Sequence, residues 1–343
     1  MKKLLLRILL VLLSVTFTLV LLEIGFRICY WKTPRGILSL DKTLGWRNTE
    51  NLSLSQQRKD AAGQVYRCTI QVGANGFREY GDTGVTNRPK VLVLGDSFTQ
   101  AYDVSNEHSY YHLLKSALNV EMFAYGCGGY GTLQEYLVLD HFVDHIQPTV
   151  LVLQLSYNDF INNCYELELQ TPWHNNAMRR PYLQEDGTVF YAMPKTDLPA
   201  LRSFGQKHSR LIDFVFTRLD RSQLKRQLAS ARSEPDVVTQ WGTNTVYRKS
   251  VAITDQVFGM IRKRVPRDTI IYAFAVDTLP PYFDEFKRLA SKNGFIFIGD
   301  TAEALHQAEQ NGQTVRAGDK THLNNLGHQI LAQVLAERLS QAR

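Results

Sequence analysis

The sequence predicts an α/β fold in which a parallel sheet is covered by helices on both faces and is preceded by one transmembrane helix. Short apolar runs alternate with longer helical stretches over most of the chain, which is the pattern of a doubly covered parallel sheet. Polar motifs follow several of these runs directly, and the carboxyl ends of strands are where open α/β sheets bind ligands. A long apolar segment at the N-terminus predicts the transmembrane helix.

Residues 1–35 are expected to form a membrane anchor and its flanks. The segment 8–22 is free of charge, and with its apolar neighbours it approaches the ~20 residues that cross a bilayer. A cleaved signal peptide is the alternative, but no small-residue cleavage site follows at the right distance. Lys2, Lys3 and Arg7 favour a cytoplasmic N-terminus. We therefore expect a single-pass protein of the inner (cytoplasmic) membrane with an extracytoplasmic, periplasmic body.

The net charge of +6 belongs mostly to this anchor. Residues 1–35 contain six basic side chains and one acidic side chain, so the rest of the chain is close to neutral. A nucleic-acid partner is therefore not indicated. The partner that this segment predicts is the membrane, through the N-terminal helix.

Residues 36–85 are expected to form an N-terminal extension with a hairpin, in which the segment 64–72 is followed by a glycine-containing turn at 73–76. Residues 86–343 are expected to form the main domain. Its predicted buried strands are 91–94, 120–125, 150–155, 269–276 and 295–298. Its predicted helices are 110–118, 133–143, 245–264, 282–292 and about 326–342.

An insertion at about 160–244 interrupts this alternation of strands and helices. Within it, residues 185–188 are typical of a turn between two short strands. Because the insertion follows a polar motif at a strand end, we expect it to form a lid or a wall of the substrate site.

Two motifs supply the residue types of nucleophilic catalysis. Ser97 follows Gly95 and Asp96 at the end of the first predicted strand, and Asp319 and His322 precede the last predicted helix. A serine hydroxyl needs an imidazole to take its proton, and a carboxylate to hold that imidazole in the right tautomer. The three-residue spacing of Asp319 and His322 allows one turn to place both side chains together.

Acyl transfer also needs donors for the developing oxyanion. Two segments offer them, the glycine-rich turn 126–132 and the segment 156–159, and both follow predicted strands. Gly129 offers a backbone N–H, and Asn158 offers a side-chain amide. Asp96 and Asp159 stand beside these groups and are expected to support the site by hydrogen bonding.

Together these motifs resemble the SGNH hydrolases, also called the GDSL-type esterase/lipase family, over about residues 90–335. The resemblance implies a three-layer α/β/α fold with a five-stranded, flavodoxin-like parallel sheet of order 2-1-3-4-5. It implies that Ser97 is the nucleophile, His322 the general base and Asp319 its orienting acid. The oxyanion hole would consist of the Ser97 and Gly129 N–H groups and the Asn158 side chain.

Two further features refine this resemblance. The segment 75–78 resembles one found in bacterial members that are anchored by an N-terminal helix. The chain departs from the usual family pattern at Phe98, where leucine or isoleucine is common, at Ala124, where asparagine often opens the turn, and at Ser156, where glycine is usual. The changes at Ala124 and Ser156 remove no predicted donor.

The expected activity is that of a serine esterase, which forms an acyl-enzyme. It would hydrolyse an ester of the cell envelope, such as an O-acylated or O-acetylated carbohydrate. Such chemistry needs no metal and no organic cofactor. An O-acetyltransferase with the same triad, a lipase acting at the bilayer, and a non-catalytic envelope scaffold remain as alternatives, although intact Ser97, Asp319 and His322 argue against the scaffold. Cys127 and Cys164 are expected either to pair in an oxidising compartment or to stay as buried thiols.

Overall fold

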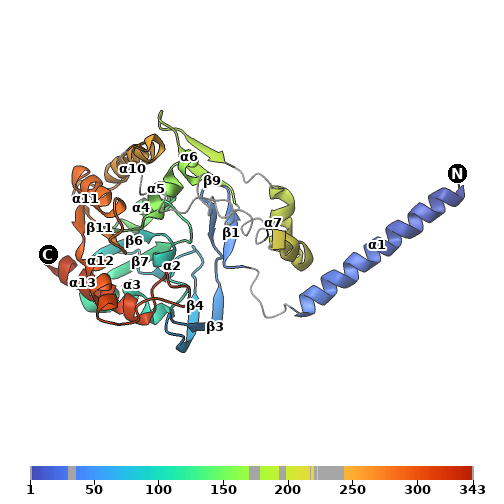
Figure 1. Cartoon of the computed structure of the whole chain (residues 1–343), viewed down its shortest axis with the longest axis horizontal. Coiled ribbons are helices and arrows are strands. Elements are labelled where there is room, and N and C mark those ends of the chain that lie inside the picture. The colour runs from blue at the N-terminus through green and yellow to red at the C-terminus, as the bar shows by residue number, and fades with distance from the viewer. Residues whose placement is uncertain are drawn as a thin grey trace.

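The structure, a computed structural model, describes residues 2–29, 36–169, 178–192, 198–216, 218, 219, 222 and 243–341. A six-stranded sheet lies at the centre of the body, in the order β12-β11-β8-β6-β7-β5 (Figure 1). Five of its strands are parallel: β6 (Lys90–Gly95), β7 (Glu121–Gly126), β8 (Val150–Leu155), β11 (Ile270–Ala275) and β12 (Ile296–Ile298).

The order of the five parallel strands confirms the predicted flavodoxin-like arrangement, since β6, the first of them, lies between β7 and β8. The sheet as a whole is mixed, because β5 (Glu79–Tyr80) adds an antiparallel strand beside β7. The prediction of a purely parallel sheet missed β5, because two residues are too few to show any periodicity.

Alternate residues of the central strands pack on opposite faces of the sheet, as the strand period requires. Val91 and Val93 point into one apolar core and Leu92 and Leu94 into the other. The first core is covered by α3 (Tyr110–Leu118), α12 (Asp300–Gln310) and α13 (Asn325–Ser340). The second is covered by α4 (Thr132–Ile146), α10 (Thr245–Arg264) and α11 (Tyr282–Lys292).

These helices match the predicted ones, except that α12 had not been predicted. Further short helices are α2 (Ser97–Gln100), η1 (Asn106–His108), α5 (Asn158–Asn163), α6 (Tyr165–Glu168) and α7 (Pro199–His208). In the insertion, β9 (Arg180–Leu183) and β10 (Val189–Ala192) form an antiparallel pair around the predicted turn at 185–188.

The N-terminal extension contains two small antiparallel sheets. The first pairs β1 (Leu38–Asp41) with β2 (Gly45–Asn48), and the second pairs β3 (Ser53–Lys59) with β4 (Val65–Gln71). The hairpin turn therefore lies before residue 65 and not at 73–76. The turn at 73–76 exists, but it leads from β4 to β5, which pairs with β7 of the main sheet.

Helix α1 (Lys2–Cys29) projects from the body (Figure 1). None of its residues is buried, and it is long and apolar enough to cross a membrane. The same length and composition also occur in signal sequences near an N-terminus.

Candidate active site

Ser97 lies where β6 ends and the short helix α2 begins. Asp96 caps this helix, because its Oδ1 accepts a hydrogen bond of 2.9 Å from the N–H of Phe98. Its Oδ2 accepts a second one of 2.7 Å from the Ser156 hydroxyl. Gln154 Oε1 accepts from the N–H groups of Asp96 and Thr99. Buried hydrogen bonds thus fix the turn that carries the serine.

Asp319 and His322 lie on a loop before α13, and this loop brings both side chains to Ser97. The Ser97 Oγ is 2.8 Å from His322 Nε2, and His322 Nδ1 is 2.5 Å from Asp319 Oδ2. Asp319 Oδ1 also accepts from the backbone N–H groups of Thr321 and His322, which holds the carboxylate in place. With Nδ1 donating to Asp319, Nε2 can accept the proton of the serine hydroxyl.

The charges around His322 favour its protonated form. Burial alone lowers the pKa of His322, but the hydrogen bond and charge of Asp319, with the charges of Asp96 and Asp103, raise it above its ordinary value overall. The hydrogen bond from His322 is the largest cause that lowers the pKa of Asp319, so Asp319 is ionised across the neutral range. An ionised carboxylate stabilises the imidazolium that forms when His322 takes a proton.

A cleft of about 870 Å³ opens above these three residues. Gly129 and Asn158 also line it, so the structure brings together every residue of the predicted catalytic group and oxyanion hole. Gly129 has a φ of +74°, a conformation that favours glycine. Within the described parts of the chain, no acceptor pairs with the backbone N–H groups of Ser97 and Gly129.

The side-chain amide of Asn158 is already engaged in hydrogen bonds within the protein. Its Nδ2 donates to the Tyr130 carbonyl at 3.2 Å and to Asn162 Oδ1 at 3.1 Å, while its Oδ1 accepts from the Ser156 hydroxyl. These bonds orient the amide at the edge of the cleft, and a substrate oxygen would have to replace one of them. The hydroxyl of Ser156 therefore contacts both Asn158 and Asp96.

Asp159 is completely buried below this loop. It accepts hydrogen bonds from the Ser156 N–H at 2.8 Å and from the Thr132 hydroxyl at 3.2 Å. Burial, with the charge of Asp96 nearby, raises the pKa of the Asp159 carboxyl well above its ordinary value. Asp96 and Asp159 thus contact the loops of the site, and neither replaces Asp319 beside His322.

The N-terminal extension forms one wall of the cleft, which the sequence analysis did not anticipate. Ile37, Leu38, Gln57, Arg58 and Lys59 line the cleft. These positions carry no motif, and only their pairing with the body brings them to the site.

Two of the contacts between the wall and the body lie next to the predicted site residues. Trp46 is fully buried, and its indole N–H donates to the Gly128 carbonyl at 3.0 Å, next to Gly129. Asp60, at the end of β3, forms a β-bridge with Ala317, two residues before Asp319. The extension therefore contacts both the glycine turn and the loop that carries Asp319.

Arg78 gives the segment 75–78 a structural role. Its side chain is buried, and it donates to the carbonyls of Gln100 and Ala101 at the end of α2, at 2.5 and 2.9 Å. It also donates to Asn106 Oδ1. Arg78 thus satisfies carbonyl groups that the four-residue helix after Ser97 leaves without partners.

Asp103 places a second carboxylate near His322. It pairs with Arg58 of the extension, with 3.4 Å between Nε and Oδ1. Ligand atoms of Asp103, Asp319 and His322 lie within 4.8 Å of one another, the kind of cluster that can bind a metal. Both ring nitrogens of His322 are already engaged by Ser97 and Asp319, so a cation would have to displace one of these bonds.

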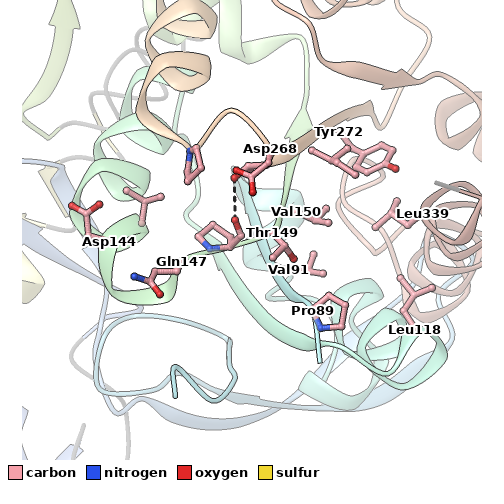
Figure 2. Close-up of a pocket in the computed structure, with 15 residues that line it drawn as sticks. Pro89, Val91, Leu118, Asp144, Gln147, Thr149, Val150, Asp268, Tyr272 and Leu339 are labelled. Atoms are coloured by element: carbon pink, nitrogen blue, oxygen red, sulfur yellow. Dashed lines mark hydrogen bonds between the residues drawn. The ribbon is translucent and has the colours of Figure 1, made fainter. Parts of the chain in front are cut away.

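A second cavity, of about 580 Å³, lies at the opposite end of the sheet, around the starts of β6, β8 and β11 (Figure 2). Its described lining residues include no histidine, serine or cysteine. Among these described residues, no serine or cysteine therefore stands beside a histidine that could take its proton.

All four cysteines are free thiols in the structure. Cys127 and Cys164 are both buried and do not pair, which agrees with the second of the two expectations. Burial raises the pKa of the Cys164 thiol to about 11, so it is not a reactive thiolate.

The sequence model of the GDSL-like lipase/acylhydrolase family matches residues 93–330. Three solved structures are similar to the chain. An α/β hydrolase enzyme from the metagenome of Lake Arreo, Spain, has 13% identity and a TM-score of 0.43, with 76% of this chain and 98% of that chain covered. The acetyl xylan esterase AlAXEase has 16% identity and a TM-score of 0.40, with 73% and 99% covered. An acetyl xylan esterase from Geobacillus stearothermophilus has 14% identity and a TM-score of 0.40, with 75% and 97% covered.

No curated protein sequence matches the chain significantly.

Proposed function

We propose that Ser97 is the nucleophile of a serine esterase. The chain belongs to the GDSL-like lipase/acylhydrolase family of SGNH hydrolases, and it is a hydrolase that acts on ester bonds. The observation that carries the proposal is the hydrogen-bonded chain from Ser97 through His322 to Asp319 at the base of the cleft. This is the order of contacts that a serine nucleophile, its general base and the orienting acid require.

The reaction proceeds in two steps of acyl transfer. His322 Nε2 takes the hydroxyl proton as Ser97 Oγ attacks the ester carbonyl, and then gives that proton to the leaving alcohol. In the second step His322 takes a proton from the water that attacks the acyl-enzyme. It then gives this proton to the Ser97 Oγ as the bond between that oxygen and the acyl carbon breaks, which releases the acid and restores the free enzyme. Asp319 keeps the Nδ1 proton in place and stabilises the imidazolium in both steps.

The oxyanion forms against three donors in this proposal. The N–H groups of Ser97 and Gly129 have no acceptor among the described residues, so they are available to a developing negative charge. The Asn158 amide becomes the third donor when it exchanges its bond to Tyr130 or Asn162 for one to the substrate.

The proposed substrate is an O-acyl or O-acetyl ester of an envelope carbohydrate. The cleft is large for a simple ester, and its lining is mixed, with Gln57, Lys59, Asn162 and Thr321 beside Tyr102 and Tyr157. Polar side chains and aromatic rings suit the hydroxyl groups and the flat faces of a sugar. Helix α1 would anchor the enzyme in the cytoplasmic membrane with the body outside, where such carbohydrates lie.

The activity is tested by p-nitrophenyl acetate hydrolysis with the full chain in detergent. The Ser97→Ala variant should lose activity by about 10⁴-fold or more, because the nucleophile is gone. Ser116→Ala on the exposed surface of α3 is the matched control and should be unchanged. Full activity in Ser97→Ala, or no activity in the folded wild type, would contradict the proposal.

The substrate class is tested separately. Acetate release from an O-acetylated polysaccharide should exceed release from the same polymer with Ser97→Ala. Across p-nitrophenyl esters, kcat/KM should fall as the acyl chain lengthens. A rise with chain length would instead indicate a lipase, and acetyl transfer to an added glycan in preference to water would indicate a transferase.

A further inference from the structure

The insertion contains a pair of helices with apolar side chains on its outside. Helix α7 is followed by a second helix over residues 210–216. The two pack closely at Gly205, where an added Cβ would lie 2.6 Å from the Ile212 Cγ2. Arg202 is buried, with its guanidinium 4.8 Å from the ring centre of Phe216. The pair, residues 198–219, is therefore a packed unit in its described residues.

The outer surface of this helix pair is strongly apolar. Leu198, Leu201 and Phe204 are three residues apart along α7, so they lie along one side of the helix. Val215 and Leu219 are four residues apart beyond it. All five are between 44% and 58% exposed, which is unusual for so many large apolar side chains in one short segment.

The helix pair is attached to the end of α1. Glu23 accepts hydrogen bonds from the Ser209 hydroxyl at 2.8 Å and from the N–H groups of Arg210 and Leu211 at 3.1 and 3.0 Å. Arg27 donates to the His208 carbonyl at 2.5 Å. Three backbone groups of the helix pair are thus held by charged side chains of α1.

An apolar contact continues this attachment, since the rings of Phe26 and Phe214 lie 4.7 Å apart. Figure 1 shows α7 on the side of the body that faces α1. The contacts between α1 and the helix pair therefore lie at the C-terminal end of α1, which is the end nearest the body.

The position of Glu23 along α1 sets the depth of the helix pair. Residues 8–22 carry no charge, and Glu23 is the first charged residue after them. If α1 crosses the bilayer, Glu23 lies where the apolar segment leaves the hydrocarbon and enters the headgroups. A segment bound to Glu23 and Arg27 is then held at that level, with Leu201 and Phe204 in reach of the acyl chains.

Basic side chains complement this location. Lys207 and Arg218 are exposed on the same helix pair, and cations beside apolar residues favour the surface of a membrane with anionic lipids. A helix with an apolar face and a basic flank lies in the interface plane and does not cross it.

We propose that the helix pair 198–219 is a membrane-interfacial element, which inserts Leu198, Leu201 and Phe204 into the outer surface of the bilayer that α1 crosses. The inference rests on the proposed membrane anchor. Its consequence is that the body has two points of attachment to the membrane, so the cleft is held at a defined height and orientation above the bilayer.

Depth-dependent fluorescence quenching tests this inference with the full chain in nanodiscs of phosphatidylethanolamine and phosphatidylglycerol. Cys29→Ser removes the exposed thiol, and the other three cysteines are buried. Single cysteines then replace Leu201, Phe204 or, as the matched control, Ile296, an exposed aliphatic residue on β12. Each is labelled with bimane and measured with nitroxide-bearing lipids.

Labels at 201 and 204 should be quenched several-fold more by shallow nitroxides than the label at 296. A label at Val15 on α1 tests the anchor itself and should be quenched most by deep nitroxides. Deep quenching at 15 with no quenching at 204 would overturn the interfacial element alone. No quenching at 15 would refute the anchor on which the inference rests.

Two variants distinguish lipid contact from other causes. Phe204→Asp changes an exposed side chain and should reduce quenching at 201, while hydrolysis of p-nitrophenyl acetate stays unchanged. Glu23→Gln weakens the attachment to α1 and should reduce quenching at both positions. Quenching at 201 that neither variant changes would overturn the inference. The inference would also be overturned if the labels at 201 and 204 were not quenched and the unlabelled cysteines at these positions formed disulfides between two copies of the chain.

Discussion

The base and the side wall of the cleft come from two regions of the chain that are built differently. The base consists of the carboxyl ends of β6, β7 and β8 with the loop that carries Asp319 and His322. The wall consists of residues 37–59 of the extension, which form two-stranded sheets outside the main one. The base lies within the part of the chain that matches the family, residues 93–330, and the wall lies before it.

The proposed catalytic residues therefore lie in the base, and the wall contributes residues that would surround the substrate. Ser97, Gly129 and Asn158 follow closely after strands that are buried on both faces, so packing and buried hydrogen bonds limit their positions. The contacts that join the wall to the base include Trp46, the bridge of Asp60 to Ala317 and the pair of Arg58 with Asp103. We therefore expect changes in the base to affect the rate, and changes in the wall to affect stability, substrate fit and the pH dependence.

The largest effect is expected at the base, for Asp319→Asn. The amide keeps the shape but cannot hold the Nδ1 proton of His322 or stabilise the imidazolium, so kcat should fall by about 10⁴-fold. Steady-state kinetics on p-nitrophenyl acetate measure it. Asp268→Asn, on an exposed loop at the other end of the sheet, is the control and should leave kcat unchanged. A fall of less than tenfold would show that another group orients His322.

The next effect concerns the joint between wall and base, at Trp46. Its side chain is fully buried, packs edge-on against Tyr130 and lies under the guanidinium of Arg180. Trp46→Ala should lower the free energy of unfolding by about 3–5 kcal/mol, because it leaves a cavity. Urea unfolding of the full chain in detergent measures this loss.

Trp46→Phe sharpens the same comparison, because it keeps most of the packing but removes the N–H bonded to Gly128. It should cost less stability than the alanine variant and still reduce kcat, since Gly128 precedes Gly129, the proposed oxyanion donor. An unchanged kcat in this variant would mean that the wall supports the fold without positioning the glycine turn.

A smaller effect on the rate is expected for Asn158→Ala. Loss of one oxyanion donor costs about 10²–10³-fold in kcat with little change in KM. Asn162→Ala is the informative control, because it removes one of the two acceptors that now engage the Asn158 amide. It should leave kcat within about threefold. Equal losses in both variants would indicate that Asn158 acts by holding its loop and not as a donor.

The sequence predicted the base of the cleft well, because its elements carry strong local signals. Apolar runs marked β6, β7 and β8, and each was followed by a motif whose residue types have a chemical reason to meet. Parallel strands bring their carboxyl ends to one edge, so the topology alone placed Ser97, Gly129 and Asn158 near one another.

The wall could not be predicted for a physical reason. Arg58 and Lys59 lie on a short exposed hairpin whose position depends on a few contacts with distant parts of the chain, such as Asp60 with Ala317. Such contacts leave no periodic pattern in the sequence. The bonds of the Asn158 amide were also unpredictable, because they depend on rotamers of Ser156 and Asn162 that only the packed loop defines.

The smallest effect is expected where base and wall meet, at the pair of Asp103 and Arg58. Activity requires neutral His322, so the acidic limb of the kcat/KM profile follows the pKa of His322. The charges of Asp319, Asp96 and Asp103 raise this pKa against the effect of burial. Negative charge near His322 favours its protonated form, so the proton is lost at a higher pH. The acidic limb should therefore lie above pH 6.5, the ordinary pKa of a histidine.

Asp103→Asn removes one of these charges, so the pKa of His322 should fall and the acidic limb should move to lower pH. Arg58→Gln removes the cation that offsets Asp103, so the limb should move to higher pH. Rates on the plateau should stay within about twofold in both, because neither residue touches Ser97 or Asp319 in the hydrogen-bonded chain. Opposite shifts would show that the extension tunes the base of the cleft by charge. Shifts in the same direction would mean that both variants act by loosening the joint, and the wall would then be only a structural support.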